Sequence, residues 1–575
     1  MLIVCPRALI GAMSQKQLRS QTWWAGNSEY YRFARRAWLR SEGFGPEIFD
    51  GRPVIGICNS WSELSNCNAH LRGLADAVKR GVWQAGGLPL EFPTISLGEM
   101  YMRPTSMLYR NLMAMDVEES IRANPLDGVV LLGGCDKTTP AQLMGCASAD
   151  LPAILVPGGP MLSGQWRDRK LGAGTDGRKL FDLFRAGRLT EEELEEIEGG
   201  IARSAGHCSV MGTASTMSSV AEAIGMTLPG CAAIPAVDAR RAAIAEASGR
   251  RIVRLVAEDV RPSSVMTQQA FENAIAVDMA LGGSTNAVVH LLALAGRLGV
   301  SISLDTFDAI SRRIPYLANI KPSGEYLMED FFHAGGVPAV MKEILPLLHA
   351  EAKTVAGTTI RQNVENCTCY NRQVIRPLDQ PLHRSGGTIV LRGNLAPDGA
   401  VLKETAATRR LLRHRGRAYV FEDHEQMLAE IDSEDLKVTA DSVLVLKNAG
   451  PIGGPGFPEW GQIPIPRVLL RQGVDDILRV SDARMSGTSF GTVVLHVAPE
   501  SAVGGPLSLV QTGDEIELDA VERSLLLHVS EDELADRRKT VRRPATPYSR
   551  GYGRLFLDHV NQANLGCDFD FLRLR

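Results

Sequence analysis

Two patterns of hydrophobic and polar positions divide the chain into two parts. From residue 50 to about 370, continuous apolar runs of strand length alternate with stretches in which apolar residues recur at helical spacing. The runs are RPVIGICNS at 52–60, LPLEFPTISL at 88–97, LDGVVLLGG at 126–134 and LPAILVPGG at 151–159. Buried strands joined by helices are typical of a parallel sheet covered on both faces. The pattern therefore predicts an α/β domain over residues 1–380.

After about residue 380 the pattern changes to short β-like runs separated by turns rich in Gly and Pro. Examples are DSVLVLKN at 441–448, GTVVLHVA at 491–498 and GDEIELDA at 513–520. Few helical stretches interrupt these runs, which favours a β-barrel or a β-sandwich. We therefore expect a β-rich, barrel-like domain over residues 381–575, with the segment 371–387 as the linker.

The composition is that of an ordinary globular protein, because 45% of the 575 residues are hydrophobic and 22% are charged. The formal net charge of −4 gives no electrostatic reason to expect nucleic acid or an anionic membrane as a partner. The sequence has no run of about 18 apolar residues that could span a membrane, and its first residues make a poor signal peptide. We therefore expect a cytoplasmic protein, with the hypothesis that translation starts at Met13.

The cysteines of the chain are candidates for metal ligands or nucleophiles. Ten cysteines in a chain of this length are too sparse for a disulfide scaffold. Three of them, Cys67, Cys135 and Cys208, each precede a stretch of helical periodicity, and a helix amino terminus lowers the pKa of a nearby thiol. Three such thiolates could share a metal or a cluster, but their long and irregular spacing taken alone favours buried cysteines without a ligand.

Cys135 is followed directly by Asp136 and Lys137, so one turn after an apolar run carries a thiol, a carboxylate and an amine. Loops at the carboxyl ends of parallel strands hold the chemistry of α/β proteins. A thiol, a carboxylate and an amine rarely share one turn without a chemical role, so these three residues are candidates for a functional site. The alternative is that Lys137 only forms a salt bridge with Asp136.

The segment GGCDKTTPAQLMG at 133–145 resembles the first signature of the dihydroxy-acid/phosphogluconate dehydratase family, and VSDARMSGTS at 480–489 resembles the second. Further family-like blocks occur in the same order, namely SNCNAHL (65–71), GHCSVMGTASTM (206–217), ALGGSTNAVVHLLAL (280–294) and GPGFPEWG (454–461). The resemblance covers nearly the whole chain. Within the family, LRSQTWW near the start and the tail RGYGRLFLDHVNQANLGCDFDFL are similar to the branch that dehydrates sugar acids.

This resemblance implies an α/β domain followed by a β-barrel domain, in agreement with the hydrophobic pattern. It also implies an iron–sulfur cluster, 2Fe-2S in the sugar-acid branch and 4Fe-4S in some relatives, whose ligands match Cys67, Cys135 and Cys208. Finally, it implies Mg²⁺ bound by acidic residues and a carbamylated lysine, at the positions that match Glu99, Asp136, Lys137 and Glu459.

The reaction implied by the resemblance removes water from a 2,3-dihydroxy acid and leaves a 2-keto-3-deoxy acid. Mg²⁺ would stabilise the charge that develops beside the carboxylate, and an iron with a free coordination position would take up the C3 hydroxyl. Ser486 matches the family's proposed base, and Thr488 would orient it or the leaving group. Without the resemblance, Ser-Gly-Thr is simply a turn. Asn286 and His290 could line the pocket, although His290 is more typical of a core histidine.

The preferred interpretation is a hydro-lyase acting on a small-molecule sugar acid, a pentonate or hexonate such as L-arabinonate or D-xylonate, assembled as a homodimer or homotetramer. The closest alternative is the dihydroxy-acid dehydratase of branched-chain amino-acid biosynthesis. A zinc protein or a redox sensor using the same thiols is a second class of function, and it predicts protein without iron.

Overall fold

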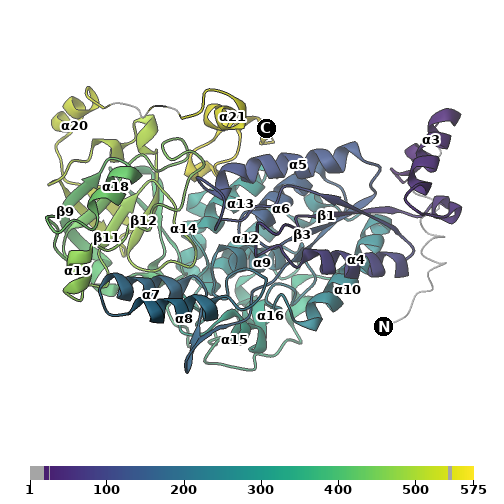
Figure 1. Ribbon diagram of the computed structural model, residues 1–575, viewed down its shortest axis with the longest axis horizontal. Helices are drawn as coiled ribbons and strands as arrows, with labels where there is room; N and C mark the ends of the chain where they lie inside the picture. Colours follow the sequence, from purple (N-terminus) through teal and green to yellow (C-terminus); the bar gives the residue numbers. More distant parts are fainter. Residues whose placement is uncertain (1–17, 25, 27, 542–544, 546, 575) are drawn as a thin grey trace.

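The computed structural model describes residues 18–24, 26, 28–541, 545 and 547–574. The hypothetical start at Met13 lies outside these residues. Figure 1 shows two parts side by side, a parallel sheet wrapped by helices and a β-barrel. The predicted fold class, an α/β part followed by a barrel, is confirmed. None of the helices in the described part of the chain combines the length and the hydropathy that a membrane span requires.

The α/β part is built on a four-stranded parallel sheet with the strand order β2-β1-β3-β4. Its strands are β1 (Val54–Asn59), β2 (Leu88–Pro93), β3 (Gly128–Gly133) and β4 (Ala153–Pro157), which fall within the four apolar runs. Helices α4 (Leu71–Gln84) and α10 (Ala239–Glu258) cover one face, and α5 (Arg110–Ala123) and α6 (Thr138–Ala149) cover the other (Figure 1). Therefore β1, β3 and β4 are buried throughout, whereas the edge strand β2 is partly exposed.

The rest of the α/β part is mainly helical, which corrects the prediction that strands and helices alternate to about residue 370. After the hairpin of β5 (Gly164–Trp166) and β6 (Arg169–Leu171), the chain forms a helical pair, α7 (Thr175–Arg185) and α8 (Glu191–Ile201). The following helices are α9 (Thr213–Ala223), α11 (Pro262–Val265), α12 (Gln268–Leu281), α13 (Asn286–Leu298), α14 (Leu304–Arg313), α15 (Met328–His333), α16 (Gly336–Glu343) and α17 (Ile360–Val364). Helices α12 and α13 are buried on nearly all sides, and such helices lack the polar face that distinguishes them from buried strands.

The C-terminal part contains a closed barrel with the strand order β10-β11-β12-β8-β7-β14-β13-β9, so the barrel alternative is confirmed over the sandwich. Its strands are β7 (Ile389–Gly393), β8 (Ala396–Leu402), β9 (Arg413–Phe421), β10 (Val443–Leu446), β11 (Leu478–Ser481), β12 (Val493–Ala498), β13 (Glu515–Asp519) and β14 (Ser524–Leu527). The sequence pattern missed β9, because RHRGRAYVF begins with arginines. Two of these, Arg413 and Arg415, form ion pairs with Asp519 and Glu515 on the neighbouring strand β13.

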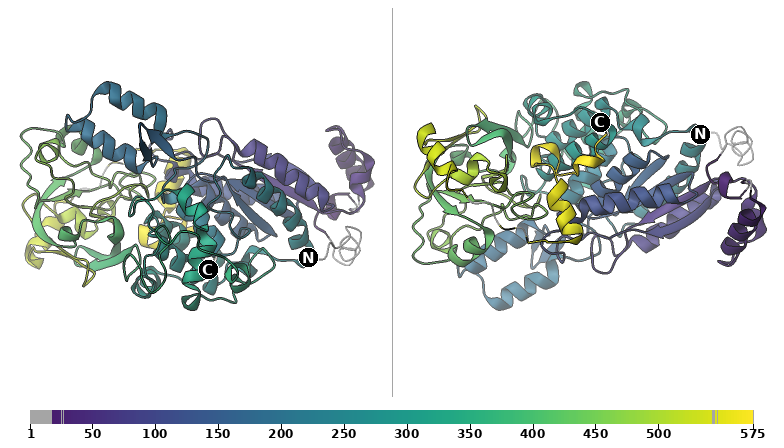
Figure 2. Two further views of the ribbon diagram at one scale, coloured as in Figure 1. Left: turned by 90° about the horizontal axis from the view of Figure 1, so that it is seen from below. Right: turned by 90° about the horizontal axis from the view of Figure 1, so that it is seen from above.

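The last residues of the chain return from the barrel to the α/β part. Helix α21 (Gly551–His559) and the residues after it lie along α5 and α13 (Figure 2). The Tyr552 hydroxyl donates to the Leu108 carbonyl at 2.8 Å, and Arg297 forms a fully buried ion pair with Asp568 at 2.6 Å. These bonds hold the two parts together, with the loops after β10 and β11 facing the carboxyl edge of the parallel sheet.

Candidate active site

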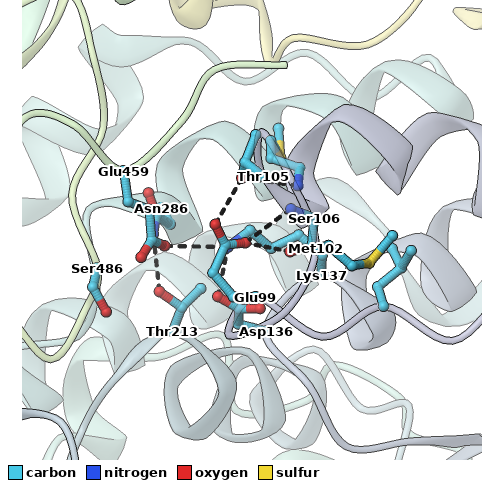
Figure 3. Close-up of polar contacts among 12 residues, drawn as sticks. Glu99, Met102, Thr105, Ser106, Asp136, Lys137, Thr213, Asn286, Glu459 and Ser486 are labelled. Carbon is cyan, nitrogen blue, oxygen red and sulfur yellow. Dashed lines mark hydrogen bonds and ion pairs between the residues drawn. The ribbon is translucent and has the colours of Figure 1, made fainter. Parts of the chain in front are cut away.

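The sequence-predicted site residues follow strands of both the sheet and the barrel. Cys67 lies in the loop after β1, Glu99 follows β2, and Cys135, Asp136 and Lys137 directly follow β3. From the barrel, Glu459 lies in the loop after β10 and Ser486 in the loop after β11. Figure 3 shows residues of both parts gathered in one place. The site is therefore formed at the carboxyl edge of the parallel sheet, where α/β folds place their ligands, and is completed by the barrel.

Three acidic residues and one lysine form what we call the carboxylate pocket. One oxygen from each of Glu99, Asp136 and Glu459 lies within 4.8 Å of the other two. The Lys137 ammonium lies among them, with Nζ at 3.0 Å from Glu99, 2.5 Å from Asp136 and 3.2 Å from Glu459. The Lys137 side chain is fully buried. Lys137 therefore does more than form a salt bridge with its neighbour Asp136, because it joins carboxylates of both parts.

Arg484 belongs to the carboxylate pocket and was missed by sequence reasoning. Its Nη1 donates to Glu459 at 2.8 Å, and its Nη2 donates to the Thr105 hydroxyl at 2.9 Å and lies 3.7 Å from Glu99. The residue is fully buried. The available signal was its place in VSDARMSGTS, two positions before Ser486, since a charged residue in a buried turn needs a partner of opposite charge.

The cations of the pocket set the protonation of its carboxylates. Burial raises the pKa of Glu459, but Lys137 and Arg484 outweigh burial and hold this pKa at about 2. For Asp136, burial has the largest effect and raises the pKa, and the neighbouring carboxylates of Glu99 and Glu459 add to the rise that Lys137 opposes. Burial and Arg484 lower the pKa of Lys137, yet the three carboxylates together raise it above its usual range. The lysine is therefore an ammonium in this arrangement.

Glu99 is positioned by the segment that follows it. The Thr105 hydroxyl donates to Oε1 of Glu99 at 2.7 Å, and the Ser106 hydroxyl and backbone N–H both donate to Oε2 (Figure 3). Thr105 in turn accepts a hydrogen bond from Arg484. The Glu99 carboxylate thus has a fixed orientation toward the pocket.

The three predicted cysteines meet beside this pocket and form what we call the thiol cluster. The thiols of Cys67 and Cys135 are hydrogen-bonded to each other, and Cys208 interacts electrostatically with both. Each cysteine precedes a helix, α4, α6 or α9, as the periodicity predicted. The Cys135 thiol lies 3.4 Å from Oδ1 of Asp136. The thiol cluster and the carboxylate pocket therefore meet at the turn that carries Cys135 and Asp136.

The loops of the thiol cluster are bonded to one another through residues next to the cysteines. The N–H of Gly206 donates to the Asn66 carbonyl at 3.1 Å, and the N–H of Gly134 donates to Oδ1 of Asn68 at 3.0 Å. A Cβ on Gly134 would lie 2.3 Å from the Cys67 carbonyl oxygen. Only glycine allows this close approach, so Gly134 brings the loops of Cys67 and Cys135 together.

The thiols of Cys67 and Cys208 do not have the lowered pKa that their helix positions led us to expect. The hydrogen bond with Cys135, followed by burial, raises the pKa of Cys67 well above its usual value. Burial, with a further contribution from Cys135, raises the pKa of Cys208 to about 12. Mutual proximity and burial therefore outweigh the helix amino termini.

Ser486 and Thr488 lie in the loop after β11, which also carries Arg484 of the carboxylate pocket. Their hydroxyl oxygens are 3.0 Å apart. Asn286, fully buried at the start of α13, donates from its side-chain amide to the Met485 carbonyl at 3.0 Å and to the Thr213 hydroxyl at 2.9 Å. Asn286 therefore fixes the Ser486 loop against the start of α9, the helix that follows Cys208.

The start of α7 packs on the other side of this loop. The Thr175 hydroxyl donates to the Thr488 carbonyl at 2.8 Å, and Arg178 lies one turn further along the helix. Arg178 lowers the pKa of both Glu459 and Cys208, so its guanidinium is within electrostatic reach of both groups of ligands. Within the described residues, its guanidinium has no hydrogen-bond or ion-pair partner. Sequence reasoning missed Arg178, which lies outside every block that suggested the family.

The predicted pocket residue His290 has the core position that the sequence favoured. It is buried in α13, and its Nδ1 accepts from Arg110 at 3.1 Å. Burial, together with Arg110 and Lys137, lowers its pKa well below the usual value, so the ring is neutral.

Comparison with known proteins agrees with this geometry. The model of the dihydroxy-acid/6-phosphogluconate dehydratase N-terminal domain matches residues 52–363, and the model of the C-terminal domain matches residues 373–567. An L-arabinonate dehydratase of Rhizobium leguminosarum bv. trifolii is 52% identical over 97% of this chain and 96% of its own. A 6-deoxy-6-sulfo-D-gluconate dehydratase of Pseudomonas putida is 52% identical over 97% of both chains. A dihydroxy-acid dehydratase of Ignicoccus hospitalis is 42% identical over 93% of this chain and 97% of its own.

The fold, the site and these matches define an enzyme that removes water from its substrate, a hydro-lyase. The chain belongs to the dihydroxy-acid/6-phosphogluconate dehydratase family.

Proposed function

We propose that this enzyme dehydrates a sugar acid, a pentonate or hexonate such as L-arabinonate or D-xylonate, and releases the 2-keto-3-deoxy acid. The observation that carries the proposal is the turn at Cys135 and Asp136, where the thiol cluster and the carboxylate pocket meet with Sγ and Oδ1 3.4 Å apart. Soft and hard donors in contact suit two different metals side by side. Two electrophiles so arranged could each bind one of two neighbouring oxygens of a hydroxy acid.

The proposed cofactors are an iron–sulfur cluster on Cys67, Cys135 and Cys208 and Mg²⁺ in the carboxylate pocket. We propose a 2Fe-2S cluster, with 4Fe-4S as the alternative. The donor sets fit these groups, because the three thiols lie within electrostatic reach of one another and the carboxylates already enclose the positive charge of Lys137. Carbamylation of Lys137 would convert its ammonium into an anionic oxygen ligand. When bound, these groups supply Lewis acidity for the developing charge and for loss of the C3 hydroxyl.

We propose Arg178 as the residue that binds the anionic part of the substrate. Three other cations near the site already bond carboxylates: Lys137 and Arg484 in the pocket, and Lys321, whose Nζ is 2.6 Å from Asp176. The guanidinium of Arg178 has no such partner among the described residues. A sugar acid carries a carboxylate. The Arg178 guanidinium can bind this carboxylate without breaking an ion pair within the protein, unlike the other three cations.

Ser486 is the proposed base that accepts the C2 proton. A serine hydroxyl is a weak base and needs neighbouring positive charge or hydrogen bonds to act. The Thr488 hydroxyl, 3.0 Å away, can donate to the Ser486 oxygen. The side-chain amide of Asn286 donates to the Met485 carbonyl in the same loop. Because one contact binds the hydroxyl and the other fixes its loop, we expect the hydroxyl to keep one orientation during turnover.

The relatives support a sugar acid over a branched-chain acid. Two that are named for sugar-acid substrates are 52% identical to this chain, whereas the dihydroxy-acid dehydratase is 42% identical. The branched-chain 2,3-dihydroxy acid is therefore the second candidate substrate.

The test is anaerobic purification, followed by iron and sulfide analysis and turnover measurements on a panel of aldonic acids and dihydroxyisovalerate. We expect iron and sulfide in the protein and turnover of at least one aldonate. Cys135→Ser should lose both iron and turnover. Cys146→Ser is the matched control, since Cys146 is a buried free cysteine in α6, apart from the thiol cluster.

Turnover confined to dihydroxyisovalerate would favour the second candidate substrate. Anaerobically prepared protein that contains zinc or no metal would contradict the proposed cofactors and favour the metal-sensor or redox-sensor class.

A further inference from the structure

Two oppositely charged side chains are buried outside the carboxylate pocket without a bonding partner. Asp278 lies in the last turn of α12 in the α/β part, and Lys403 directly follows strand β8 of the barrel. Both side chains are fully buried. Within the described part of the chain, neither the two carboxylate oxygens of Asp278 nor Nζ of Lys403 has a hydrogen-bond partner. A buried charge without compensation is strongly unfavourable, so each group depends on the charge of the other.

The two residues are within electrostatic reach of each other. Burial raises the pKa of Asp278 to about 7, and the charge of Lys403 opposes this rise. Burial likewise lowers the pKa of Lys403 to about 7, and the charge of Asp278 opposes this fall. Among the described residues, no third charged group shifts the pKa of either one. The pair is therefore an electrostatic link between α12 of the α/β part and β8 of the barrel.

The Asp278 side chain supports the turn that follows α12, residues 282–285, which we call the glycine turn. A Cβ on Gly283 would lie 2.0 Å from Oδ1 of Asp278. Only glycine allows this close approach, so the carboxylate lies directly against the backbone of the turn. The next residue, Ser284, has its hydroxyl 2.8 Å from that of Thr213 at the start of α9. The glycine turn is therefore held between Asp278 and α9.

The glycine turn in its turn contacts the loop of residues 482–492, which joins β11 to β12 and carries Ser486. A Cβ on Gly487 would lie 2.6 Å from Oγ of Ser284. The turn and the loop are thus in direct contact at the residue that follows Ser486. A displacement of the glycine turn would therefore displace the Ser486 backbone.

The end of the same loop is bonded to the segment that follows Lys403. The N–H of Gly491 donates to the Ala406 carbonyl at 2.8 Å. The N–H of Thr408 donates to the Thr492 hydroxyl at 3.0 Å. The loop is therefore supported on one side by the glycine turn and on the other by this segment of the barrel.

We propose that Asp278 and Lys403 are positioning residues for the Ser486 loop and that they act as a pair. Asp278 supports the loop through the glycine turn, and Lys403 supports it through the segment that follows β8. The attraction between the two charges keeps these supports together and holds the Ser486 hydroxyl in place. The inference rests on the proposed role of Ser486 as the base, and the pair acts only through the loop.

The first test is hydrogen exchange of the amides of residues 482–492 in Asp278→Asn and in Lys403→Met. We expect exchange at least about tenfold faster than in the wild type, because the loop opens more often when one support is lost. The amides of β3 serve as the reference for an intact fold, and Asp278→Asn is nearly isosteric. The matched control is Glu222→Gln, which alters another buried carboxyl group whose oxygens accept from backbone N–H groups of a different loop. It should leave exchange of residues 482–492 unchanged.

The second test is steady-state kinetics on the best substrate. Each single variant should lower kcat about 10–100-fold, because a small displacement of a reacting group has an effect of this size. KM should change less than about twofold, because the groups that bind substrate keep their places. Since the two residues act as a pair, Asp278→Asn/Lys403→Met should have a kcat no lower than that of the worse single variant.

Loop exchange at the wild-type rate in both single variants would overturn the proposal. Losses of kcat that multiply in the double variant would overturn it as well, because they would show that the two residues act independently. Ser486→Ala, measured alongside, distinguishes this proposal from the proposed function. If Ser486→Ala kept its kcat, the proposed base would be wrong, and hydrogen exchange alone would decide whether the pair supports the loop. If Ser486→Ala lost turnover while both pair variants kept theirs, the pair would be wrong and the proposed function would stand.

Discussion

In the carboxylate pocket, three carboxylates face two buried cations, Lys137 and Arg484, and each carboxylate has at least one of them within 4.0 Å. In the adjacent thiol cluster, no sulfur within the described residues is bonded to a cationic side chain. The pKa values reflect this difference. The Lys137 and Arg484 charges hold the pKa of Glu459 at about 2, whereas burial raises that of Cys208 to about 12.

The carboxylate pocket and the thiol cluster therefore differ in how much they depend on positive charge from a bound metal group. In the carboxylate pocket, two cations of the chain itself compensate most of the charge of the three carboxylates. The thiol cluster is stable only with its thiols protonated, because three thiolates together in a buried place would be unfavourable. We therefore expect assembly of the thiol half with a metal group to release protons, and the following changes test each half in turn.

The largest effect is expected for Cys135→Ala, which removes the residue at the junction of the two halves. We expect loss of bound iron and turnover below detection, since a cluster held by two thiols has lost a ligand that no neighbour replaces. Iron analysis and the visible spectrum measure the loss. If this variant kept its iron and turned over normally, the thiol half would have no role in the reaction.

The next largest effect is expected for Ser486→Ala. It should lower kcat about 10²–10⁴-fold, because a positioned base has been removed. Iron and metal content should stay those of the wild type. Ser489→Ala is the control, because Ser489 is a buried hydroxyl in the same loop without a hydrogen-bond partner in the described structure. An equal loss in both variants would indicate damage to the loop rather than loss of a base.

Arg484→Gln should weaken metal binding by the carboxylate pocket and leave the thiol cluster unchanged. Glu459 and Glu99 would lose the cation that holds them, so we expect a divalent metal to bind about 10–100-fold more weakly. Calorimetric titration with Mg²⁺ or Mn²⁺ provides the measurement. Arg479→Gln is the matched control, because Arg479 is equally buried and paired with Asp476 at 2.6 Å but belongs to strand β11, outside the carboxylate pocket. Equal metal binding in the two variants would contradict this role of Arg484.

Arg178→Gln should have the smallest effect, because its side chain is exposed. The loss of one solvent-screened ion pair is worth about 1 kcal/mol, which corresponds to a rise in KM of about fivefold with kcat little changed. Steady-state kinetics on the best substrate separate the two constants. Arg188→Gln removes an exposed arginine in the turn after α7 and should change neither. A large fall in kcat for Arg178→Gln would mean that it acts in the reaction itself.

The sequence was most informative where a local pattern was sufficient. Four apolar runs predicted the strands of the parallel sheet, and the order of the signature blocks identified the residues that the fold brings together. Cys67, Glu99 and Cys135 could be assigned to one edge because each follows a strand, and the carboxyl ends of parallel strands share an edge.

Features that depend on distant partners could not be read from the sequence. Arg484 donates to Thr105, which is 379 positions away, and nothing in the local pattern of either residue predicts that contact. Strand β9 was missed because its arginines only become acceptable once they pair with the acids of β13. The raised pKa of Cys67 likewise depends on its hydrogen bond with Cys135. The position of each cysteine before a helix does not predict that contact.

The return of the C-terminal residues to the α/β part has a consequence for synthesis of the enzyme. Asp568 forms a buried pair with Arg297, which lies 271 positions earlier in the chain, so this contact can form only after the barrel strands between them have been synthesised. Domains generally fold in order as they leave the ribosome. The sheet can therefore form early, but we expect the final docking of the two parts, and with it loading of the site with cofactors, to wait until the residues after the barrel have left the ribosome.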